Sequence, residues 1–440
     1  MQKKLLTTAI FILLNRLIFT QVITQSDSLL TKASLQNCIN YALVHQPTLK
    51  QSLIGEEITN AEIRSKLADW FPQLSFNFNL QHAYELPTSI FQGNAVKFGL
   101  INTSSGQFSL TQTIFNRDVL LSASTAHEVR TQAKQQTARN KIDVVVNVSK
   151  AFYGVLLAQD QIELINEDVA RLKISQHDTY SQYKSGVVDK TDYMRATVAL
   201  NNAEAEQKQY NENLKTSVAF IKYQMGYPSG EELRLEYDST QMENDTFIDT
   251  TMKINYSNRI EYKLLLTQKN LQKANLDYYV WSFLPSLSAY GEYNINFMND
   301  NFSKLYDKNY PNSYIGLQLS FPIFQGTKRI QEIDQASLEL KNVDYDIASL
   351  KNSISAEYTQ AMAAYVSNFN NLNVQKENLK LAKDVYNTIQ LQYKSGIKTY
   401  LDVITAETDL RTTQVNYISA LYQTLSSKLD VEKALGIIKY

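Results

Sequence analysis

The sequence predicts a mainly helical protein that also contributes transmembrane β-strands. The 440 residues include only 13 glycines and 7 prolines, roughly 3% and 2% against average usage of about 7% and 5%, so helices can run long without interruption. Two stretches carry apolar side chains at an average spacing of about 3.5 residues, the period of supercoiled helices. Four other segments alternate apolar and polar residues, the period of a β-strand.

The N-terminal segment predicts an export signal over residues 1–24. Lys3 and Lys4 precede an apolar stretch from Leu5 to Leu14, which is the pattern of a bacterial signal peptide. The stretch is too short for a membrane-spanning helix, which needs about 20 apolar residues. The mature chain is therefore predicted to begin near Gln25.

The rest of the chain is a tandem duplication. The string at Gln182–Gly186 recurs unchanged at Gln392–Gly396. Self-similarity at a fixed offset indicates that one supersecondary unit has been copied. We predict a first repeat over 25–227 and a second over 258–440, joined by an acidic linker over 228–257 that is interpreted as solvated.

Each repeat is predicted to form a long helical hairpin. No proline and no plausible break interrupts 118–184 or 328–394, so each helix is predicted to span about 67 residues, or about 100 Å at 1.5 Å per residue. The spacing of 3.5 residues predicts that neighbouring helices supercoil. Each long helix ends at a Lys-Ser-Gly turn, where glycine terminates the helix. The turns are predicted at 184–188 and 394–398, and the returning helices at about 189–226 and 399–436.

Each repeat also carries a pair of strands. In the first, Leu74, Phe76 and Phe78 alternate with Ser75 and Asn77, so that one face is apolar and the other polar. A polar loop of about 15–25 residues joins each pair. The strands are predicted at about 73–85 and 107–115 in the first repeat, and at about 286–297 and 313–324 in the second.

These strands predict a membrane barrel shared between chains. They are about 10 residues long, the length of a tilted bilayer crossing. A barrel in lipid must close, because an open edge leaves backbone groups without hydrogen bonds. Four strands cannot close, and about eight is the practical minimum. The chain is therefore predicted to oligomerise, with eight strands in a dimer or twelve in a trimer, and the duplication favours the trimer.

Composition and motifs exclude several classes of function. The 43 basic and 44 acidic residues give a net charge of −1, so there is no basic field for nucleic acid. Cys38 is the only cysteine, and the four histidines show no ligand spacing, so we predict no metal site and no cofactor. The sequence has no glycine-rich phosphate loop, HExxH or GxSxG motif, and the protein is predicted not to be an enzyme.

Several segments match a known family in their order, spacing and duplication: Leu35, Ala42-Leu43, Pro47 and Leu49; Asn258-Arg259; Leu284–Ser288; Phe321–Gly326; and Gly396–Ala406. On these segments the chain resembles the TolC-type outer-membrane efflux factor family over nearly its whole mature length. The resemblance implies a homotrimer in which twelve strands form an outer-membrane β-barrel and twelve helices continue it as a periplasmic α-barrel. It implies a passive channel whose partners are outer-membrane lipid, a periplasmic adaptor (membrane fusion protein) and an inner-membrane pump.

The resemblance further implies a gate at the periplasmic tip. Polar links between helices close the tunnel in the family, and the matching positions are Thr191 and Asp192 in the first repeat, with Tyr393 and Lys398 in the second. The position of Lys398 is commonly arginine, and lysine lacks the bidentate geometry of arginine, so a weaker link is expected.

The resemblance also implies an acidic entrance and a docking tip. Asp402 matches the first of two acidic positions that ring the tunnel entrance, whereas the second position is Thr405. Three copies of Asp402 around one axis would favour cations. The turns are expected to meet the adaptor through Lys184, Ser185, Gly186, Lys394, Ser395 and Gly396.

A second interpretation remains open from the sequence. The chain could be a periplasmic coiled-coil interaction protein, such as an adaptor, whose strands form a soluble sheet. The alternation of apolar and polar residues in four separate strands favours the channel.

Overall fold

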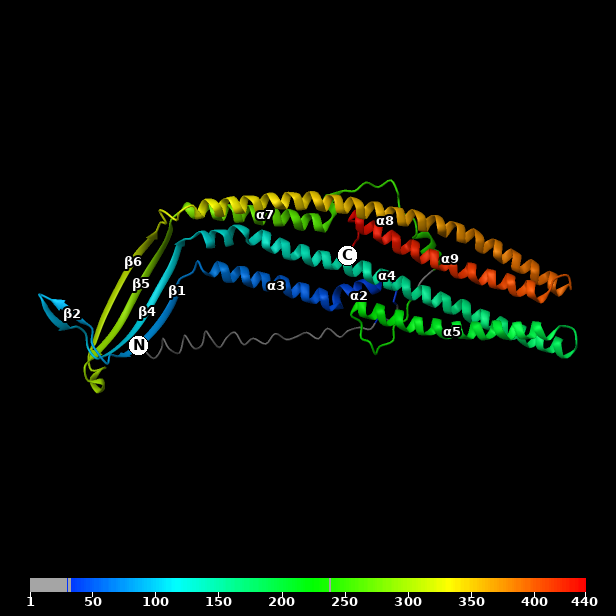
Figure 1. The fold of residues 1–440 in the computed structure, drawn as a ribbon, viewed down its shortest axis with the longest axis horizontal. Coiled ribbons are helices and arrows are strands. Elements are labelled where there is room, and N and C mark those ends of the chain that lie inside the picture. The colour runs from blue at the N-terminus through cyan, green and yellow to red at the C-terminus, as the bar shows by residue number, and fades with distance from the viewer. Residues whose placement is uncertain (1–29, 31–32, 237–238) are drawn as a thin grey trace.

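The computed structural model describes residues 30, 33–236 and 239–440, so the predicted signal peptide over 1–24 lies outside the described residues. The chain is long and narrow, with its main sheet near one end and the turns of its long helices at the other (Figure 1). The helices are α2 (Leu35–His45), α3 (Pro47–Ala68), α4 (Arg117–Lys184), α5 (Lys190–Met225), α6 (Ser239–Asn244), α7 (Ile260–Val280), α8 (Lys328–Lys394) and α9 (Tyr400–Leu435). The strands are β1 (Gln73–His82), β2 (Thr88–Phe91), β3 (Asn94–Lys97), β4 (Asn102–Phe115), β5 (Ser286–Asn299) and β6 (Asn309–Ser320).

Two long helices run the whole distance from the sheet to the far end. α4 has 68 residues and α8 has 67, or about 100 Å each. α5 and α9, of 36 residues each, fold back along the far half of α4 and α8. α3 and α7 lie along the half near the strands (Figure 1). The predicted long antiparallel helical hairpins are therefore confirmed.

The main core lies midway along the molecule, where α2, α4, α5 and α9 meet. Phe152 and Leu156 of α4, Ile221 of α5 and Leu425 of α9 are at most 1% exposed. Burying each such side chain contributes about 1.5–3 kcal/mol. Among the described helices, one window of α4 is apolar enough to cross a membrane, but half of that window is buried inside the protein. The core fixes the two repeats to each other at mid-length.

The last long helix of each repeat ends at a glycine. That glycine packs against the first residues of the helix that leads to the strands, α3 or α7. Gly226, after α5, and Gly436, after α9, have φ angles of +68° and +70°, in the left-handed region that glycine adopts readily. A Cβ atom on Gly226 would lie 2.9 Å from the carbonyl oxygen of His45. One on Gly436 would lie 2.9 Å from the carbonyl carbon of Asn258. Both backbone conformation and close packing therefore require glycine.

Replacing Gly436 by alanine is expected to destabilise the protein more than the same change at Gly396. Gly396 also has a positive φ, of +74°, but a Cβ atom there would meet nothing within 4 Å. Gly396→Ala should therefore cost only the left-handed strain of about 1–2 kcal/mol. Gly436→Ala should cost at least about 1 kcal/mol more, because the new atom also forces the chain at Asn258 to move. Thermal unfolding in detergent checks the difference, and equal midpoints for the two variants would contradict it.

The four long strands form one antiparallel sheet in the order β1-β4-β5-β6. The β4–β5 pairing joins the strand pair of the first repeat to that of the second. β1 and β6 are the edges of the sheet, and each has one partner within the chain. Because an unpaired edge cannot face lipid, a membrane position requires further strands at both edges.

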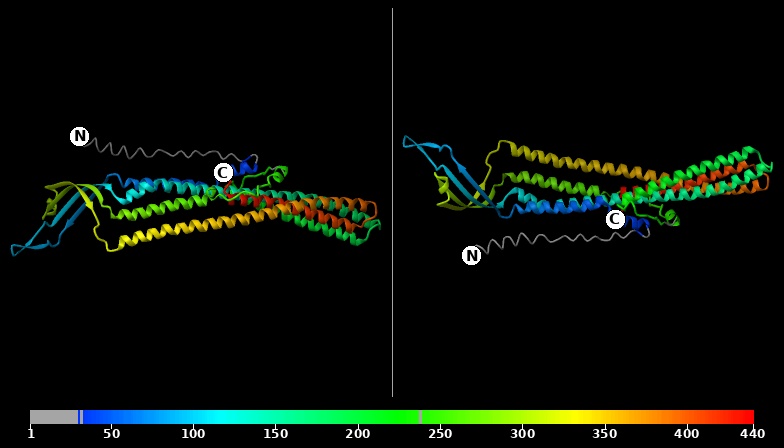
Figure 2. Two further views of the ribbon diagram at one scale, coloured as in Figure 1. Left: turned by 90° about the horizontal axis from the view of Figure 1, so that it is seen from above. Right: turned by 90° about the horizontal axis from the view of Figure 1, so that it is seen from below.

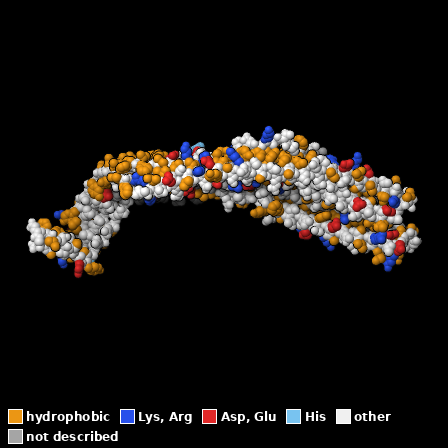
Figure 3. Space-filling model, turned by 45° about the horizontal axis from the view of Figure 1, so that its top comes forward, with side chains coloured by type: hydrophobic (Ala, Val, Ile, Leu, Met, Phe, Trp, Pro, Cys, Tyr) orange, Lys and Arg blue, Asp and Glu red, His pale blue; other side chains and the backbone are white. Residues whose placement is uncertain are grey.

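The register places the apolar side chains of the sheet on one face. Leu110 of β4 lies between Leu74 of β1 and Gly291 of β5, and Gly291 is opposite Ile315 of β6. Ile315 is 90% exposed and Leu317, two residues on, is 70% exposed. Figure 3 shows further apolar side chains over the part of the long helices that adjoins the sheet, whereas the side of the sheet seen in this view is mainly white. The predicted apolar face is therefore continuous across four strands.

The opposite face of the sheet is polar and internally hydrogen-bonded. Gln107 Nε2 of β4 donates to Glu292 Oε2 of β5 at 2.7 Å, and the Tyr314 hydroxyl of β6 donates to the same carboxylate oxygen. Gly316 lies beneath the Tyr290 ring, whose hydroxyl oxygen would be 2.8 Å from an added Cβ atom. One face thus suits lipid and the other suits water.

The strands differ from the prediction at their ends. β4 begins at Asn102 instead of 107, because the Asn102 amide is buried and donates to the carbonyls of Asn299 and Asp300 at 3.1 and 2.9 Å. β6 ends at Ser320 instead of 324, and the Pro322 carbonyl beyond it accepts a hydrogen bond from Arg329. β1 ends at His82 instead of 85.

The loop between β1 and β4 is also not the purely polar segment that the sequence predicts. It contains a hairpin in which β2 pairs with β3. Gln92 and Gly93 both have positive φ at its turn, as a tight hairpin turn requires. Ile90 and Phe91 are exposed, and Figure 2 shows the hairpin projecting beyond the ends of the other strands. The loop between β5 and β6, residues 300–308, is shorter than predicted.

The acidic linker over 228–257 is not solvated throughout: acidic side chains such as Glu231 and Glu232 are exposed, but part of the segment packs on the long helices. Thr246 and Ile248 are buried. The Tyr365 hydroxyl of α8 donates to the Thr246 carbonyl at 2.9 Å and accepts from the Ile248 amide at 3.1 Å. The charged residues alone suggested that the linker is exposed to solvent. The apolar side chains and backbone groups between them determine how it packs.

Acidification is expected to loosen this linker through Glu243. A hydrogen bond from Lys376 Nζ at 2.5 Å, followed by one from the Tyr417 hydroxyl, lowers the pKa of Glu243. A lowered folded-state pKa stabilises the docked linker above the ordinary carboxyl pKa, and this contribution is lost as the pH falls through the folded value. The protection of the amides of residues 242–250 against hydrogen exchange, measured relative to the intrinsic exchange rate at each pH, should therefore fall below about pH 4.

Variants separate this effect from general acid unfolding. Glu243→Gln should show weaker protection against exchange already at pH 7, and little further change in protection as the pH falls. Glu232→Gln is the matched control, because among the described residues the Glu232 carboxylate forms its ion pair with the exposed Arg234, at 2.9 Å, within the linker itself. Equal exchange in wild type and Glu243→Gln at pH 7 would contradict the assignment.

Candidate functional site

The two turns at the far end have the same backbone design. The amide of Gly186 donates to the Tyr183 carbonyl at 3.1 Å, and that of Val187 donates to the Gln182 carbonyl at 2.9 Å. The second turn repeats this pattern around Gly396 at 2.9 Å for both bonds. These paired bonds are the Schellman motif, which satisfies the last carbonyls of a helix. The duplicated Lys-Ser-Gly string therefore specifies two matching helix ends.

The returning helices begin with side-chain caps at equivalent positions. The Asp189 carboxylate accepts a hydrogen bond from the Thr191 amide at 3.3 Å. At the start of α9, the Thr399 hydroxyl accepts from the Asp402 amide at 3.3 Å, and Asp402 Oδ2 accepts from the Thr399 amide at 2.9 Å. This reciprocal capping box holds the α9 terminus in one conformation.

Asp402 therefore has a local structural role besides the one expected at the entrance. The Thr399 amide and then the Thr399 hydroxyl lower the pKa of Asp402. Asp402 Oδ1 also lies 3.8 Å from Lys398 Nζ. The carboxylate thus stays ionised at neutral pH and keeps a negative charge beside the tip.

The predicted gate residues lie together near the two turns. Thr191 is exposed and Asp192 is half-buried on α5, while Lys398 is exposed just before α9. In the described part of a single chain, the ion pair of Lys398 is with Asp402 on its own hairpin. The links from Lys398 to Thr191 and Asp192 therefore stay a prediction.

Tyr393 connects the two hairpins. Its hydroxyl lies 3.5 Å from Gln182 Oε1, so that α8 is linked to α4. Burial raises the pKa of Tyr393, and the charges of Asp192 and Asp178 raise it further. The Tyr393 hydroxyl thus remains a hydrogen-bond donor at neutral pH. Asp192 is the acidic residue with which the predicted gate pairs it.

The expected docking residues all lie on the surface. Solvent reaches the Lys-Ser-Gly residues of both turns, and the next residues, Val187 and Ile397, are each 72% exposed. An exposed apolar side chain between basic and polar residues suits contact with another protein. The exposed residues are Lys184, Ser185, Gly186, Lys394, Ser395 and Gly396.

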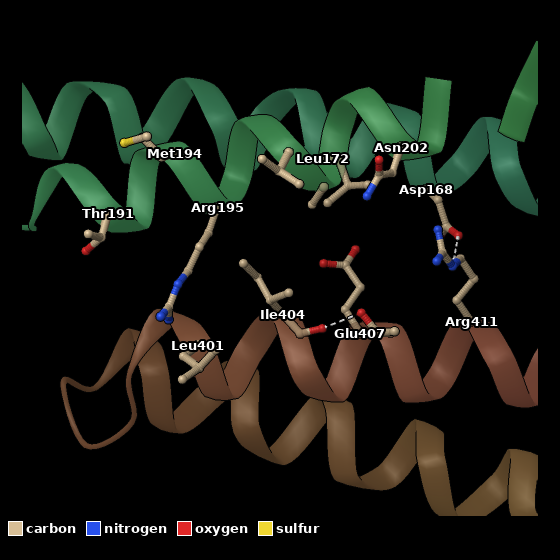
Figure 4. Close-up of a pocket in the computed structure, with 13 residues that line it drawn as sticks. Asp168, Leu172, Thr191, Met194, Arg195, Asn202, Leu401, Ile404, Glu407 and Arg411 are labelled. Carbon is tan, nitrogen blue, oxygen red and sulfur yellow. Dashed lines mark hydrogen bonds and ion pairs between the residues drawn. The ribbon is translucent and has the colours of Figure 1, made fainter. Parts of the chain in front are cut away.

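A groove of about 790 Å³ separates α5 from α9 behind the tip. Its apolar wall includes Met194, Leu401 and Ile404 (Figure 4). Arg195 and Arg411 bring charge to the same groove. Next to it, the Ser175 and Tyr400 hydroxyls hydrogen-bond at 2.7 Å and hold α4 to α9.

Sequence reasoning missed several of these contacts. The pattern Thr399-x-x-Asp402 could have been recognised as a capping box from the sequence alone. Gln182, Ser175 and Tyr400 carried no such signal, because their partners lie on another helix hundreds of residues away. Among the described residues, no group of three or more His, Cys, Asp or Glu side chains is placed to hold a metal ion.

Comparison with known proteins shows which family shares this architecture. A model of the outer membrane efflux protein family matches residues 38–226 and 268–437. The chain is 22% identical to the outer membrane protein TolC of Vibrio cholerae over 419 residues, which cover 92% of this chain and 91% of that protein. It is also 22% identical over 410 residues to the probable efflux pump outer membrane protein TtgC of Pseudomonas putida, covering 92% and 83%.

A solved structure shares the fold. The outer membrane protein VceC of Vibrio cholerae superposes with a TM-score of 0.72 at 13% identity, covering 91% of this chain and 96% of that one. The two segments matched by the family model fall in the two repeats, and the packed linker lies between them. The chain therefore belongs to the outer membrane efflux protein family.

Proposed function

We propose that the protein is the outer-membrane channel of a tripartite efflux or secretion system. Three copies contribute four strands each to a closed barrel of twelve strands in the outer membrane. Their long helices continue the barrel as a periplasmic tunnel. Transport through this tunnel is passive, and an inner-membrane pump supplies the energy.

One observation carries this proposal: the single chain forms a sheet that cannot close by itself. The sheet has two edges, one apolar face and one hydrogen-bonded polar face. Lipid requires closure of such a sheet, and identical copies supply the missing strands. The polar face then lines the pore, and the apolar face meets the bilayer.

The tip supports a gate and a docking site. Tyr393, Lys398 and Asp402 lie on or next to the second turn, and Thr191 and Asp192 lie just after the first. The exposed turns then present the surface for a periplasmic adaptor of the membrane fusion type.

Single-channel conductance and oligomer mass, measured on one purified sample, test the proposal. A trimeric mass in detergent with a small, cation-selective current in a planar bilayer is the expected result. A monomeric, water-soluble protein without conductance would contradict it, and would favour a periplasmic coiled-coil interaction protein instead.

A further inference from the structure

A cluster of charged side chains joins three helices at the inner end of the groove. Arg171 of α4 donates to Asp168 Oδ1 on the same helix and to Glu407 Oε1 of α9, the latter at 3.2 Å. Arg411 of α9 lies 3.9 Å from Asp168 Oδ2 and 3.3 Å from Glu206 Oε2 of α5. Figure 4 shows Arg411 directed at Asp168. We call these five residues the ion cluster.

Asp168 is the buried centre of the ion cluster. It is 2% exposed, and among the described residues its Oδ2 atom has no hydrogen-bond partner. A buried carboxylate is unfavourable unless positive charge compensates it. Arg171 supplies such charge to Oδ1 from the same helix, and Arg411 adds a second positive charge from the other hairpin, 3.9 Å from Oδ2. The pairing therefore ties the first hairpin to the second through a group that cannot be solvated in its present place.

The position of the ion cluster matters for movement of the tip. Asp168 precedes the end of α4 at Lys184 by about 24 Å, at 1.5 Å per residue. The groove extends over this distance, from Thr191 and Leu401 near the turns to Arg411 at the cluster. On the tip side of the cluster α5 and α9 are thus separated by open space, and at the cluster Arg411 links them through Glu206.

The ion cluster is better suited to fixing the position of the helices than to stabilising the fold. Apolar residues of similar volume often stabilise a protein as well as a buried ion pair does, whereas in some proteins buried polar or ionic groups fix one arrangement of the helices. A cluster that spans α4, α5 and α9 defines both the distance and the rotation between the two hairpins. Loss of one charge should allow the distance and rotation between the two hairpins to vary, while the apolar core stays intact.

We propose that the ion cluster is the pivot of the tip. It holds α9 against α4 and α5, so that the turns of the two hairpins swing against each other about this point when the channel opens. This inference rests on the proposed gate at the tip. Arg411 is accordingly a positioning residue that acts on the gate from a distance.

Arg411→Gln in the full-length protein tests the pivot with two readouts. Single-channel conductance is expected to rise about threefold or more, because the resting tip is no longer held in one position. Hydrogen exchange over residues 400–411 is expected to be about tenfold faster. Arg411→Lys keeps the charge and should restore most of the wild-type behaviour on both measures.

A matched control is available on the first hairpin. Lys173 Nζ of α4 pairs with Glu204 Oε1 of α5 at 3.2 Å, so this ion pair stays within one hairpin. Glu204→Gln should leave conductance and exchange unchanged. If Arg411→Gln does not assemble, Asp168→Asn replaces it with the same expectations, because it removes the buried charge itself.

Parallel measurement of Lys398→Ala separates the pivot from the gate. If Lys398→Ala raises conductance and Arg411→Gln does not, the gate stands and the pivot is wrong. If only Arg411→Gln raises it, the pivot stands and the Lys398 link is wrong. Unchanged conductance in both variants overturns both, even where exchange over 400–411 rises.

Discussion

Lys398→Ala is expected to raise the passive conductance of the channel several-fold. Lys398 lies two residues before the start of α9 at Tyr400, and its Nζ atom is 3.8 Å from the Asp402 carboxylate. The proposed gate places it against Thr191 and Asp192 of the other hairpin. Removing the ammonium group of Lys398 removes its attraction to Asp402 and to Asp192. The two carboxylates are then left to repel each other. Planar-bilayer recording at fixed salt measures the effect.

Lys394→Ala is the control for this experiment. Lys394 is an exposed lysine at the end of α8, on the same turn, but it holds no position in the proposed gate. Its removal changes the net charge of the tip equally and should leave conductance near wild type. Asp192→Ala should act in the same direction as Lys398→Ala. Unchanged conductance in both gate variants would eliminate the gate assignment.

Raised salt gives an independent check on the gate. Exposed ion pairs are screened beyond about 3 Å at 1 M salt. The relative excess conductance of Lys398→Ala over wild type should therefore shrink as salt is raised, because the wild-type link weakens as well. A constant ratio across salt concentrations would mean that Lys398 acts through something other than its charge.

Ile315→Arg is expected to abolish assembly in the outer membrane. Ile315 is near the middle of β6 on the apolar face and is 90% exposed in the single chain. An arginine facing lipid at the bilayer midplane costs about 2–4 kcal/mol, and a trimer would carry it three times. The measurement is the amount of heat-stable oligomer in outer-membrane fractions.

Asn312→Arg provides the matched control on the same strand. Asn312 is opposite Asn294 of β5 and points to the polar face. An arginine there would meet water in the pore, so assembly should persist and only ion selectivity should shift towards anions. Equal loss of oligomer in both variants would mean that the two faces are not distinguished by lipid.

The sequence alone determined the parts of this protein that depend on local pattern. The absence of proline and of other breaks predicted α4 and α8 almost to the residue, and the repeated Lys-Ser-Gly string predicted both turns. Alternation of apolar and polar residues predicted which face of the strands is apolar. These signals are readable because helix period, glycine conformation and strand pleat act between near neighbours in the chain.

The strand ends and loops were predicted less well. Asn102 extends β4 through bonds to Asn299 and Asp300, which belong to the other repeat. The short run around Ile90 and Phe91 is too brief for its period to be recognised. In each case the deciding interaction joins segments far apart, or involves too few residues for a pattern.

Only the tertiary structure decided how the two repeats are held together. The pairing of β4 with β5, the docking of Thr246 on Tyr365, and the ion cluster around Asp168 all join distant segments. In the sequence, Asp168 and Arg411 are two charged residues among many. The fold removes water from Asp168 and brings Arg411 to it, and the energy of a charge depends on that burial and that partner.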